Sequence, residues 1–275
     1  MNDMDENMVW VPSAERIRSA TLTRFRAFSS DRTGRSFSDS LDLHAWSISE
    51  PDEFWDAVWD FFSVIGEKGD TVLINGADML GARFFPESRL NFAENLLRKS
   101  PGISDADDAL VFRAEDHVEE RWSWGKLRTE VSRLAEAMRA EGIGPGDRVA
   151  GLLPNRPEAI AAMLATASIG GVWTSASPDF GPRGVLDRFG QVEPKLLFAT
   201  DGYWYGGKRV SLVGKLTEVV RGLPSVKRII VIEQLGDVRA VTSAIPNCIS
   251  LDEFLRPTSG PVSYTHLTLP TIYSV

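Results

Sequence analysis

Apolar residues in the first third of the chain recur at helical spacing. From Phe54 onward they fall at i, i+1, i+4, i+5 and i+8, which predicts an amphipathic helix with an aromatic stripe. Residues 49–52 (Ser-Glu-Pro-Asp) predict its start, because they supply a capping hydroxyl, a first-turn proline and acidic residues at the positive helix end. Ser13 is expected to cap an earlier helix that contains Ile17 and Phe25. We interpret the aromatic stripe as core packing.

From about residue 109 the pattern changes to strands that alternate with helices. Residues 109–113 and 120–124 predict a hairpin, and Ser123 then caps a long helix. Pro157 is expected to open a second helix, and residues 250–253 (Ser-Leu-Asp-Glu) form a capping box. The expected inward positions of the two helices are Leu127, Val131, Leu134, Ala135 and Met138, and Ile160, Met163, Leu164 and Ala167; the apolar strands are residues 148–153, 172–175, 195–200 and 228–233.

This alternation predicts an α/β fold, with a helical N-terminal region followed by a parallel sheet. Right-handed crossovers place helices on both faces of such a sheet, so its strands should be buried on both sides. Ligands of these sheets bind in the loops after the carboxyl ends of the strands. Here those loops are residues 154–157, 175–182 and 201–208.

Composition narrows the possible partners. The chain has 275 residues, of which 43% are hydrophobic and 25% are charged, as in ordinary globular proteins. Its net charge of −8 argues against nucleic acid as the main partner, because phosphate backbones are bound by basic faces. No apolar run reaches the roughly 20 residues of a membrane span. Cys248 is the single cysteine, and the acidic N-terminus does not resemble a secretory signal, so we expect a cytoplasmic protein.

The C-terminal tail differs from the rest. Residues 262–275 resemble the translation of a sequencing-library adapter, so we expect the natural sequence to depart from this one after about residue 261. A genuine β-strand is the alternative, because valine, tyrosine, threonine and isoleucine suit strands.

Two loops carry candidate chemistry. In residues 177–181 (Ser-Pro-Asp-Phe-Gly), Asp179 offers a hydrogen-bond acceptor and Phe180 a wall for a pocket, although the same run also suits an Asx-turn. In residues 201–209, glycines allow a ligand to approach the backbone, aromatic rings offer stacking and Lys208 offers charge. A solvated, glycine-rich connection is the alternative there. The sequence contains no Walker loop, metal-ligand spacing, Cys/His pair or Gly-x-Ser-x-Gly motif.

Several segments together resemble the adenylate-forming superfamily, and within it the acetoacetate–CoA ligases. Residues 54–59 and 83–97 are similar to the N-terminal helical region of acetyl-CoA synthetases. Residues 144–159 resemble the start of the AMP-binding domain, and residues 168–181 resemble its acetoacetate-type version. Residues 185–198 and 203–208 continue that pattern. The resemblance implies a helical region at 1–105, the first part of an AMP-binding domain at 106–261, and a non-native tail at 262–275.

The resemblance also implies substrates and site residues. The family uses ATP, with Mg²⁺ on its phosphates, to convert a carboxylic acid such as acetoacetate into an acyl-adenylate, which CoA then attacks. By alignment, Ser177, Pro178 and Asp179 lie along the pantetheine arm of CoA. The segment Tyr205, Gly206, Gly207 and Lys208 contacts the CoA nucleotide, with Tyr205 in place of an arginine.

Other family motifs are missing from the chain. The family's Ser/Thr/Gly-rich phosphate loop, its adenine and ribose motifs and its catalytic lysine do not occur here, so no catalytic residue is assigned and the chain alone is expected to be inactive. Three other interpretations remain open: a ligase for another short or medium-chain acid, a non-catalytic module that binds CoA or a nucleotide, and a structural α/β domain.

Overall fold

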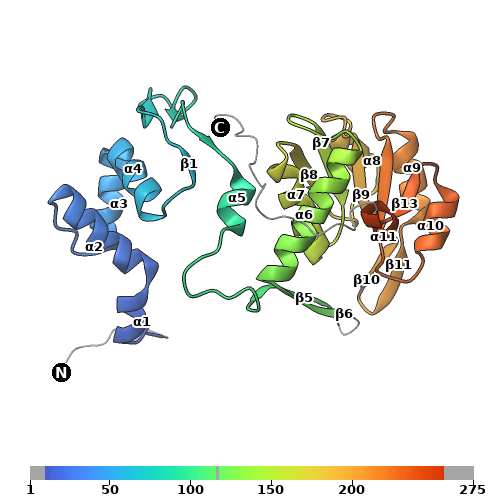
Figure 1. Cartoon of the computed structure of the whole chain (residues 1–275), viewed down its shortest axis with the longest axis horizontal. Coiled ribbons are helices and arrows are strands. Elements are labelled where there is room, and N and C mark those ends of the chain that lie inside the picture. The colour runs from blue at the N-terminus through green and yellow to red at the C-terminus, as the bar shows by residue number, and fades with distance from the viewer. Residues whose placement is uncertain (1–9, 116–117, 257–275) are drawn as a thin grey trace. The chain divides into compact units, whose positions relative to one another are not determined.

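The computed structural model describes residues 10–115 and 118–256, which form two compact units that divide between Arg89 and Leu90 (Figure 1). The domain boundary predicted near residue 105 stays a prediction. The tail from 262 to 275 lies outside the described residues, and so does its adapter interpretation.

The first unit consists of helices packed around aromatic side chains. Its elements are α1 (Ala14–Ser19), α2 (Thr21–Thr33), α3 (Ser40–Ser49), α4 (Pro51–Phe61), and the short strands β1 (Gly66–Glu67), β2 (Leu73–Ile74), β3 (Arg83–Phe84) and β4 (Arg89–Leu90). Its core consists of Phe25, Phe37, Leu43, Trp46 and Ala57, against which Phe28, Phe54, Val58 and Phe61 pack. The aromatic stripe contributes to core packing only in part: Phe54 and Val58 pack against this core, whereas Trp55 is 43% exposed and Phe62, just after α4, is 44% exposed.

The helix starts of the first unit were predicted only in part. Ser13 caps α1 by accepting a hydrogen bond from the N–H of Arg16 at 3.2 Å, but this helix ends at Ser19 and Phe25 belongs to α2. Pro51 begins α4 as expected. The predicted capping role of Ser49 is wrong, because its hydroxyl donates backward to the carbonyl of Trp46 at the end of α3.

The second unit contains the sheet. Its elements are α5 (Phe92–Leu97), β5 (Asp108–Ala114), β6 (Val118–Ser123), α6 (Trp124–Ala140), β7 (Arg148–Leu152), α7 (Pro157–Ser168), β8 (Val172–Ala176), α8 (Pro182–Phe189), β9 (Leu196–Thr200), β10 (Gly202–Tyr205), β11 (Lys208–Ser211), α9 (Val213–Arg221), β12 (Arg228–Ile232), α10 (Val238–Ala244), β13 (Cys248–Ser250) and α11 (Leu251–Leu255). The strand order of the main sheet is β13–β12–β9–β7–β8, and every neighbouring pair is parallel. Leu152 is in register with Ala176 and with Ala199, so the carboxyl ends of β7, β8 and β9 lie level.

Apolar side chains cover both faces of this sheet. One core joins α6, α7 and α11 to strand residues such as Val149, Phe198 and Ile230. The other joins α8, α9 and α10 to the opposite face through Ala150, Leu197 and their neighbours (Figure 1). Ser123 caps α6 and Ser250 caps α11, as expected. All five predicted inward positions of α6 are buried. The parallel sheet and its two helical layers confirm the predicted α/β class.

Three details of the second unit differ from the expectations. β8 is an edge strand whose Val172 is 49% exposed, so burial on both faces holds for β7, β9 and β12 but not for β8. In α7, Ala161, Ala162 and Ala165 are buried with Leu164, whereas Ile160 is 37% exposed. Residues 202–211 form the antiparallel β10–β11 hairpin rather than an irregular loop.

Candidate functional site

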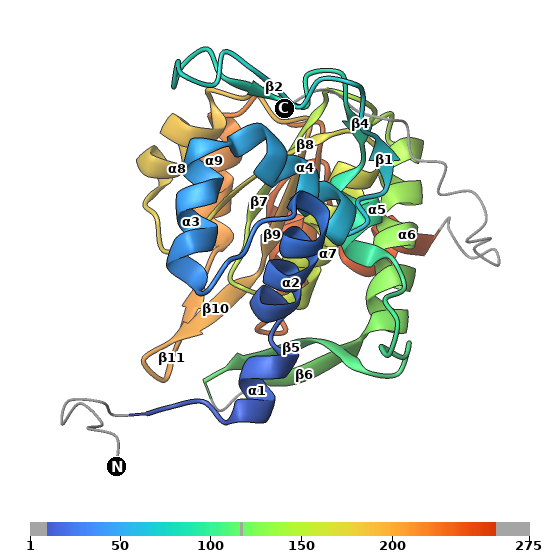
Figure 2. The ribbon, with the colours of Figure 1, turned by 90° about the vertical axis from the view of Figure 1, so that its left-hand side faces the viewer.

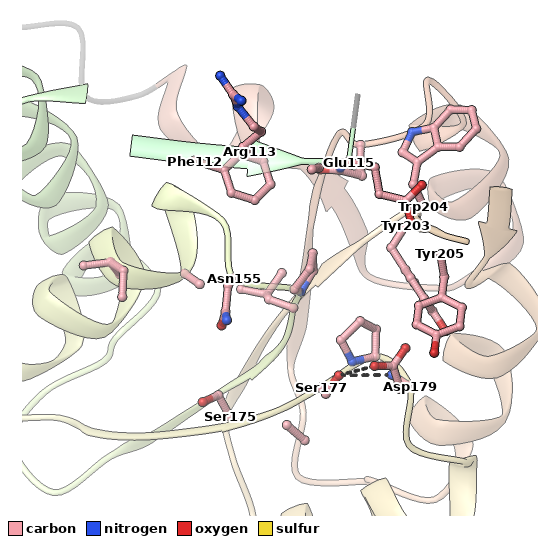
Figure 3. Close-up of a pocket in the computed structure, with 18 of the residues that line it drawn as sticks. Phe112, Arg113, Glu115, Asn155, Ser175, Ser177, Asp179, Tyr203, Trp204 and Tyr205 are labelled. Atoms are coloured by element: carbon pink, nitrogen blue, oxygen red, sulfur yellow. Dashed lines mark hydrogen bonds between the residues drawn. The ribbon is translucent and has the colours of Figure 1, made fainter. Parts of the chain in front are cut away.

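A cavity of about 530 Å³ lies at the carboxyl ends of β7 and β8 in the second unit (Figure 3). Its walls come from residues 112–115 of the β5–β6 hairpin, 153–155 after β7, 159, 160 and 163 on α7, 175–179 at the end of β8 and after it, and 203–205 on β10. All three loop regions expected to bind ligands therefore contribute to one cavity. Ile160 and Met163 line it as well, and Met163 also packs against the core on this face of the sheet.

The loop after β8 is a tight turn. The hydroxyl of Ser177 donates to the Asp179 carboxylate at 3.0 Å and accepts from the N–H of Asp179 at 3.3 Å. The ammonium of Lys215 on α9 donates to the carbonyl of Pro178 and so ties the turn to α9. Ser177, Pro178 and Asp179 all line the cavity. Phe180 does not: its ring lies 4.2 Å from the guanidinium carbon of Arg188, so its expected place in a pocket wall is wrong.

Two tyrosines of β10 face this turn. Tyr203 and Tyr205 are two residues apart on one strand, so their side chains lie on the same face and project toward the Ser177–Asp179 turn (Figure 3). Burial raises the pKa of the Tyr203 phenol, and the hydrogen bond to Asp179 and the negative charge of Asp179 raise it further. Tyr203 therefore stays protonated and neutral at physiological pH.

A buried arginine joins the cavity walls to the sheet. Arg156, which is only 5% exposed, lies 2.8 Å from Glu158 and 3.1 Å from Glu120 of β6, and it donates to the carbonyl of Glu233 at 3.1 Å. Burial alone lowers the pKa of Arg156, but the hydrogen bond to Glu158 and the neighbouring carboxylate charges raise it above the usual value. The guanidinium therefore remains charged, and it ties the β5–β6 hairpin to the loops after β7 and β12.

A buried carboxylate supports the second hairpin. Asp201 immediately precedes β10 and is fully buried. It accepts hydrogen bonds from the N–H groups of Gln234 at 2.8 Å, Leu235 at 3.0 Å and Asp237 at 2.7 Å. These three N–H donors satisfy the hydrogen-bonding capacity of the carboxylate, and its negative charge also acts on the guanidinium of Arg156. Asp201 therefore fixes the base of the β10–β11 hairpin to the loop after β12.

The remaining predicted site residues lie at the tip of this hairpin. Gly206 and Gly207 form its two-residue turn, and Lys208 begins β11 with an exposed side chain. None of the three lines the cavity, but they follow Tyr205, which does. The turn instead holds the carboxylate of Glu115, a residue that sequence reasoning missed.

Residues 10–115 and 118–256 contain no group of three or more His, Cys, Asp or Glu side chains that could hold a metal ion. Within that part of the chain, no helix is both long enough and apolar enough to cross a bilayer.

The parallel sheet with its cavity beyond the strand ends defines an α/β protein of the kind that binds small ligands at that edge. Matches to protein-family models show which family of α/β proteins this chain belongs to. Residues 104–251 match the AMP-binding enzyme family, and residues 41–96 match the acetyl-coenzyme A synthetase N-terminus. The first match covers more than half of the chain, so the chain belongs to the AMP-binding enzyme family, as the resemblance predicted.

Curated relatives are similar over nearly the whole chain. An acetoacetyl-coenzyme A synthetase of Rhizobium meliloti is 48% identical over 265 residues, which cover 95% of this chain and 40% of the relative. An acetoacetyl-CoA synthetase of Macaca fascicularis is 38% identical, with 90% and 37% covered. The solved acetoacetyl-CoA synthetase from Streptomyces lividans superposes with a TM-score of 0.81 at 40% identity, over 97% of this chain and 39% of that one. The chain thus spans about 40% of the length of these relatives.

Proposed function

We propose that this chain is the N-terminal part of an ATP-dependent acetoacetate–CoA ligase. The observation that carries the proposal is the joint match of both units to this group, with 48% identity to the Rhizobium meliloti acetoacetyl-coenzyme A synthetase. In the reaction, the carboxylate of the acid attacks the α-phosphate of ATP and releases pyrophosphate. The thiol of CoA then attacks the acyl-adenylate, so that the thioester forms and AMP leaves.

The cavity is proposed as the site of the CoA pantetheine arm. Ser177, Pro178 and Asp179 lie on one wall, and the side chain of Asn155 points into the cavity from the loop after β7 (Figure 3). The pantetheine arm is a chain of amides and methylenes. A partly apolar cavity with a few hydroxyl, amide and carboxylate groups suits such a ligand. Tyr205 then lies between this arm and the hairpin turn.

The hairpin tip is proposed to contact the nucleotide of CoA. Lys208 has an exposed ammonium there, and Gly206 and Gly207 present backbone N–H groups. Tyr205 is 70% exposed and offers a ring face to the adenine, although it cannot supply the charge of an arginine. The single buried Cys248 is compatible with a cytoplasmic enzyme.

ATP and Mg²⁺ are proposed as requirements of the whole enzyme. When bound, Mg²⁺ neutralises phosphate charge during adenylate formation. The sequence lacks the phosphate loop and the catalytic lysine of the family. The groups described here therefore bind and orient CoA rather than activate the acid.

A ligase for another acid is the second candidate. A malonamoyl-CoA synthetase of Penicillium aethiopicum is 32% identical over 95% of the chain. Membership of this group is therefore compatible with more than one short acid.

The deciding experiment uses the uninterrupted gene. The enzyme it encodes should release AMP when given ATP, CoA and acetoacetate, more efficiently than with acetate or malonamate, whereas the 275-residue chain alone should release none. Lys208→Ala and Asp179→Asn in that enzyme should raise the KM for CoA more than the KM for ATP. A gene that stops near residue 261 would favour a non-catalytic binding module, and a preference for another acid would replace acetoacetate in the proposal.

A further inference from the structure

The tip of the β10–β11 hairpin binds a carboxylate from a distant part of the chain. Glu115 directly follows β5. Its Oε1 accepts a hydrogen bond from the N–H of Gly206 at 2.7 Å, and its Oε2 accepts one from the N–H of Gly207 at 2.9 Å. Each oxygen of the carboxylate thus takes one backbone donor. Both hairpins lie at the same end of the second unit in both views (Figures 1 and 2).

The geometry of this turn makes it a general anion site. Gly206 has a φ of 57° and Gly207 a φ of 73°, as a type I′ turn requires. A Cβ on either glycine would meet no atom within 4 Å, so the backbone conformation and not crowding favours glycine here. The two successive N–H groups point outward from the turn, and such backbone nests bind carboxylates and phosphates alike.

The arginines near the turn are engaged in ion pairs, whereas Lys208 is exposed to an incoming anion. Arg209 is engaged by Asp237 at 3.0 Å and by the carbonyl of Leu235 at 2.7 Å. Arg113 is paired with Glu119 at 2.8 Å. Lys208 beside the turn is exposed, and no ion pair of its ammonium occurs among the described residues. The positive potential at the tip therefore comes from the two N–H groups and Lys208, and Glu115 is the anion that offsets it.

We propose that Glu115 occupies the position that a phosphoryl group of CoA takes, and that the two anions exchange on the turn. This inference rests on the proposed CoA site. Because both carry negative charge, they cannot share two donors, so Glu115 must leave the turn before a phosphate binds. Glu115 thus weakens the binding of phosphate-bearing ligands and leaves pantetheine, which has no phosphate, unaffected.

The test compares Glu115→Gln with the unaltered 275-residue chain. Glutamine keeps the size and an acceptor oxygen but removes the charge. Glu218→Gln, at an exposed position on α9, is the matched control for net charge. Titrations with inorganic pyrophosphate, CoA and pantetheine are followed by the amide resonances of Gly206 and Gly207 and by calorimetry. Removing one competing charge should tighten pyrophosphate and CoA binding about fivefold in Glu115→Gln, with no change for pantetheine or in the control.

Each result is decisive. The exchange is refuted if pyrophosphate binds Glu115→Gln and the unaltered chain equally, if it fails to bind either, or if it moves other amides while those of Gly206 and Gly207 stay unchanged. The proposed CoA site fails separately: pyrophosphate then behaves as expected, while neither CoA nor pantetheine perturbs Asn155 or Ser177 in any variant. A thermal melt of Glu115→Gln that matches the control shows that both variants are folded.

Discussion

The guanidinium of Arg156 lies 3.1 Å from the carboxylate of Glu120, and this contact joins the main sheet to the β5–β6 hairpin. The hairpin is not part of that sheet, yet it supplies one wall of the cavity and the carboxylate of Glu115. Arg156 also lies 5.7 Å from the ring centre of Phe112, which lines the cavity. The position of that wall therefore depends on this buried charge and on the packing of Trp122 in the core, and not on strand pairing with the main sheet.

Replacement of Arg156 by methionine is expected to destabilise the chain by about 2 kcal/mol, because it leaves the partly buried carboxylates of Glu120 and Glu158 without their partner. The free energy of unfolding in urea measures this. Arg113→Met is the control, because it breaks the exposed pair with Glu119 and should cost less than about 1 kcal/mol. Equal losses in the two variants would show that the Arg156 network does not hold the hairpin.

Asp147→Asn is expected to destabilise the chain by about 1 kcal/mol near neutral pH, because Asp147 lies 2.5 Å from the ammonium of Lys195 and is only partly exposed. The hydrogen bond from Lys195, helped by the N–H of Gly144, lowers the pKa of Asp147 in the folded state. Its contribution is therefore complete above the unfolded-state pKa of about 3.9 and is lost as the pH falls through the lower folded-state value.

Urea titrations of both proteins at neutral and strongly acidic pH test this sign. The difference in unfolding free energy between the unaltered chain and Asp147→Asn should shrink as the pH falls. A difference that grows toward acid would contradict the lowered pKa.

The hydrophobic pattern predicted the layers better than the site. Ser123, Leu127 and Met138 behave as expected because capping and helical periodicity are local properties. The site depends on partners distant in sequence, such as Glu115 with Gly206, whose positions follow from tertiary packing. Asp39 illustrates a local signal that was available: its carboxylate caps α3 by accepting from the N–H of Leu41 at 2.8 Å, yet no helix was predicted there.

The difference between local signals and tertiary contacts also explains why the hairpin of residues 202–211 was expected to be a loop. Alternation is weak there, and a glycine pair suits both a loop and a type I′ turn. In the structure, Tyr203 pairs with Val210 in an antiparallel register, so the segment is a hairpin and not a loop. Likewise, Ile160 and Met163 satisfy a helical stripe, but both line the cavity, whereas Ala161, Ala165 and Leu164 of the same helix are fully buried in the core.

Asp179→Asn is expected to lower the pKa of Tyr203 toward its ordinary value. Burial remains in this variant, so the shift should be partial, while the hydrogen bond to a carboxylate and its negative charge are removed. Spectrophotometric titration of tyrosinate measures the change, and Tyr203→Phe identifies which transition belongs to Tyr203 among the four tyrosines. Identical titrations of the unaltered chain and Asp179→Asn would show that the Ser177–Asp179 turn does not contact Tyr203.

Cys248 is expected to resist alkylation in the folded chain. It lies at the start of the edge strand β13 and is buried, and burial raises the pKa of its thiol to about 11. Because the thiolate is the reactive form, a rise of this size lowers the thiolate fraction near neutral pH on the order of a hundredfold. Iodoacetamide labelling followed by mass spectrometry should therefore be slow in buffer and fast in urea, where the thiol regains its ordinary pKa. Labelling in buffer as fast as in urea would mean that the β12–β13 edge opens readily.

Arg156→Met provides an internal comparison for this labelling experiment. If the substitution loosens only the β5–β6 hairpin, the labelling rate at Cys248 stays that of the unaltered chain.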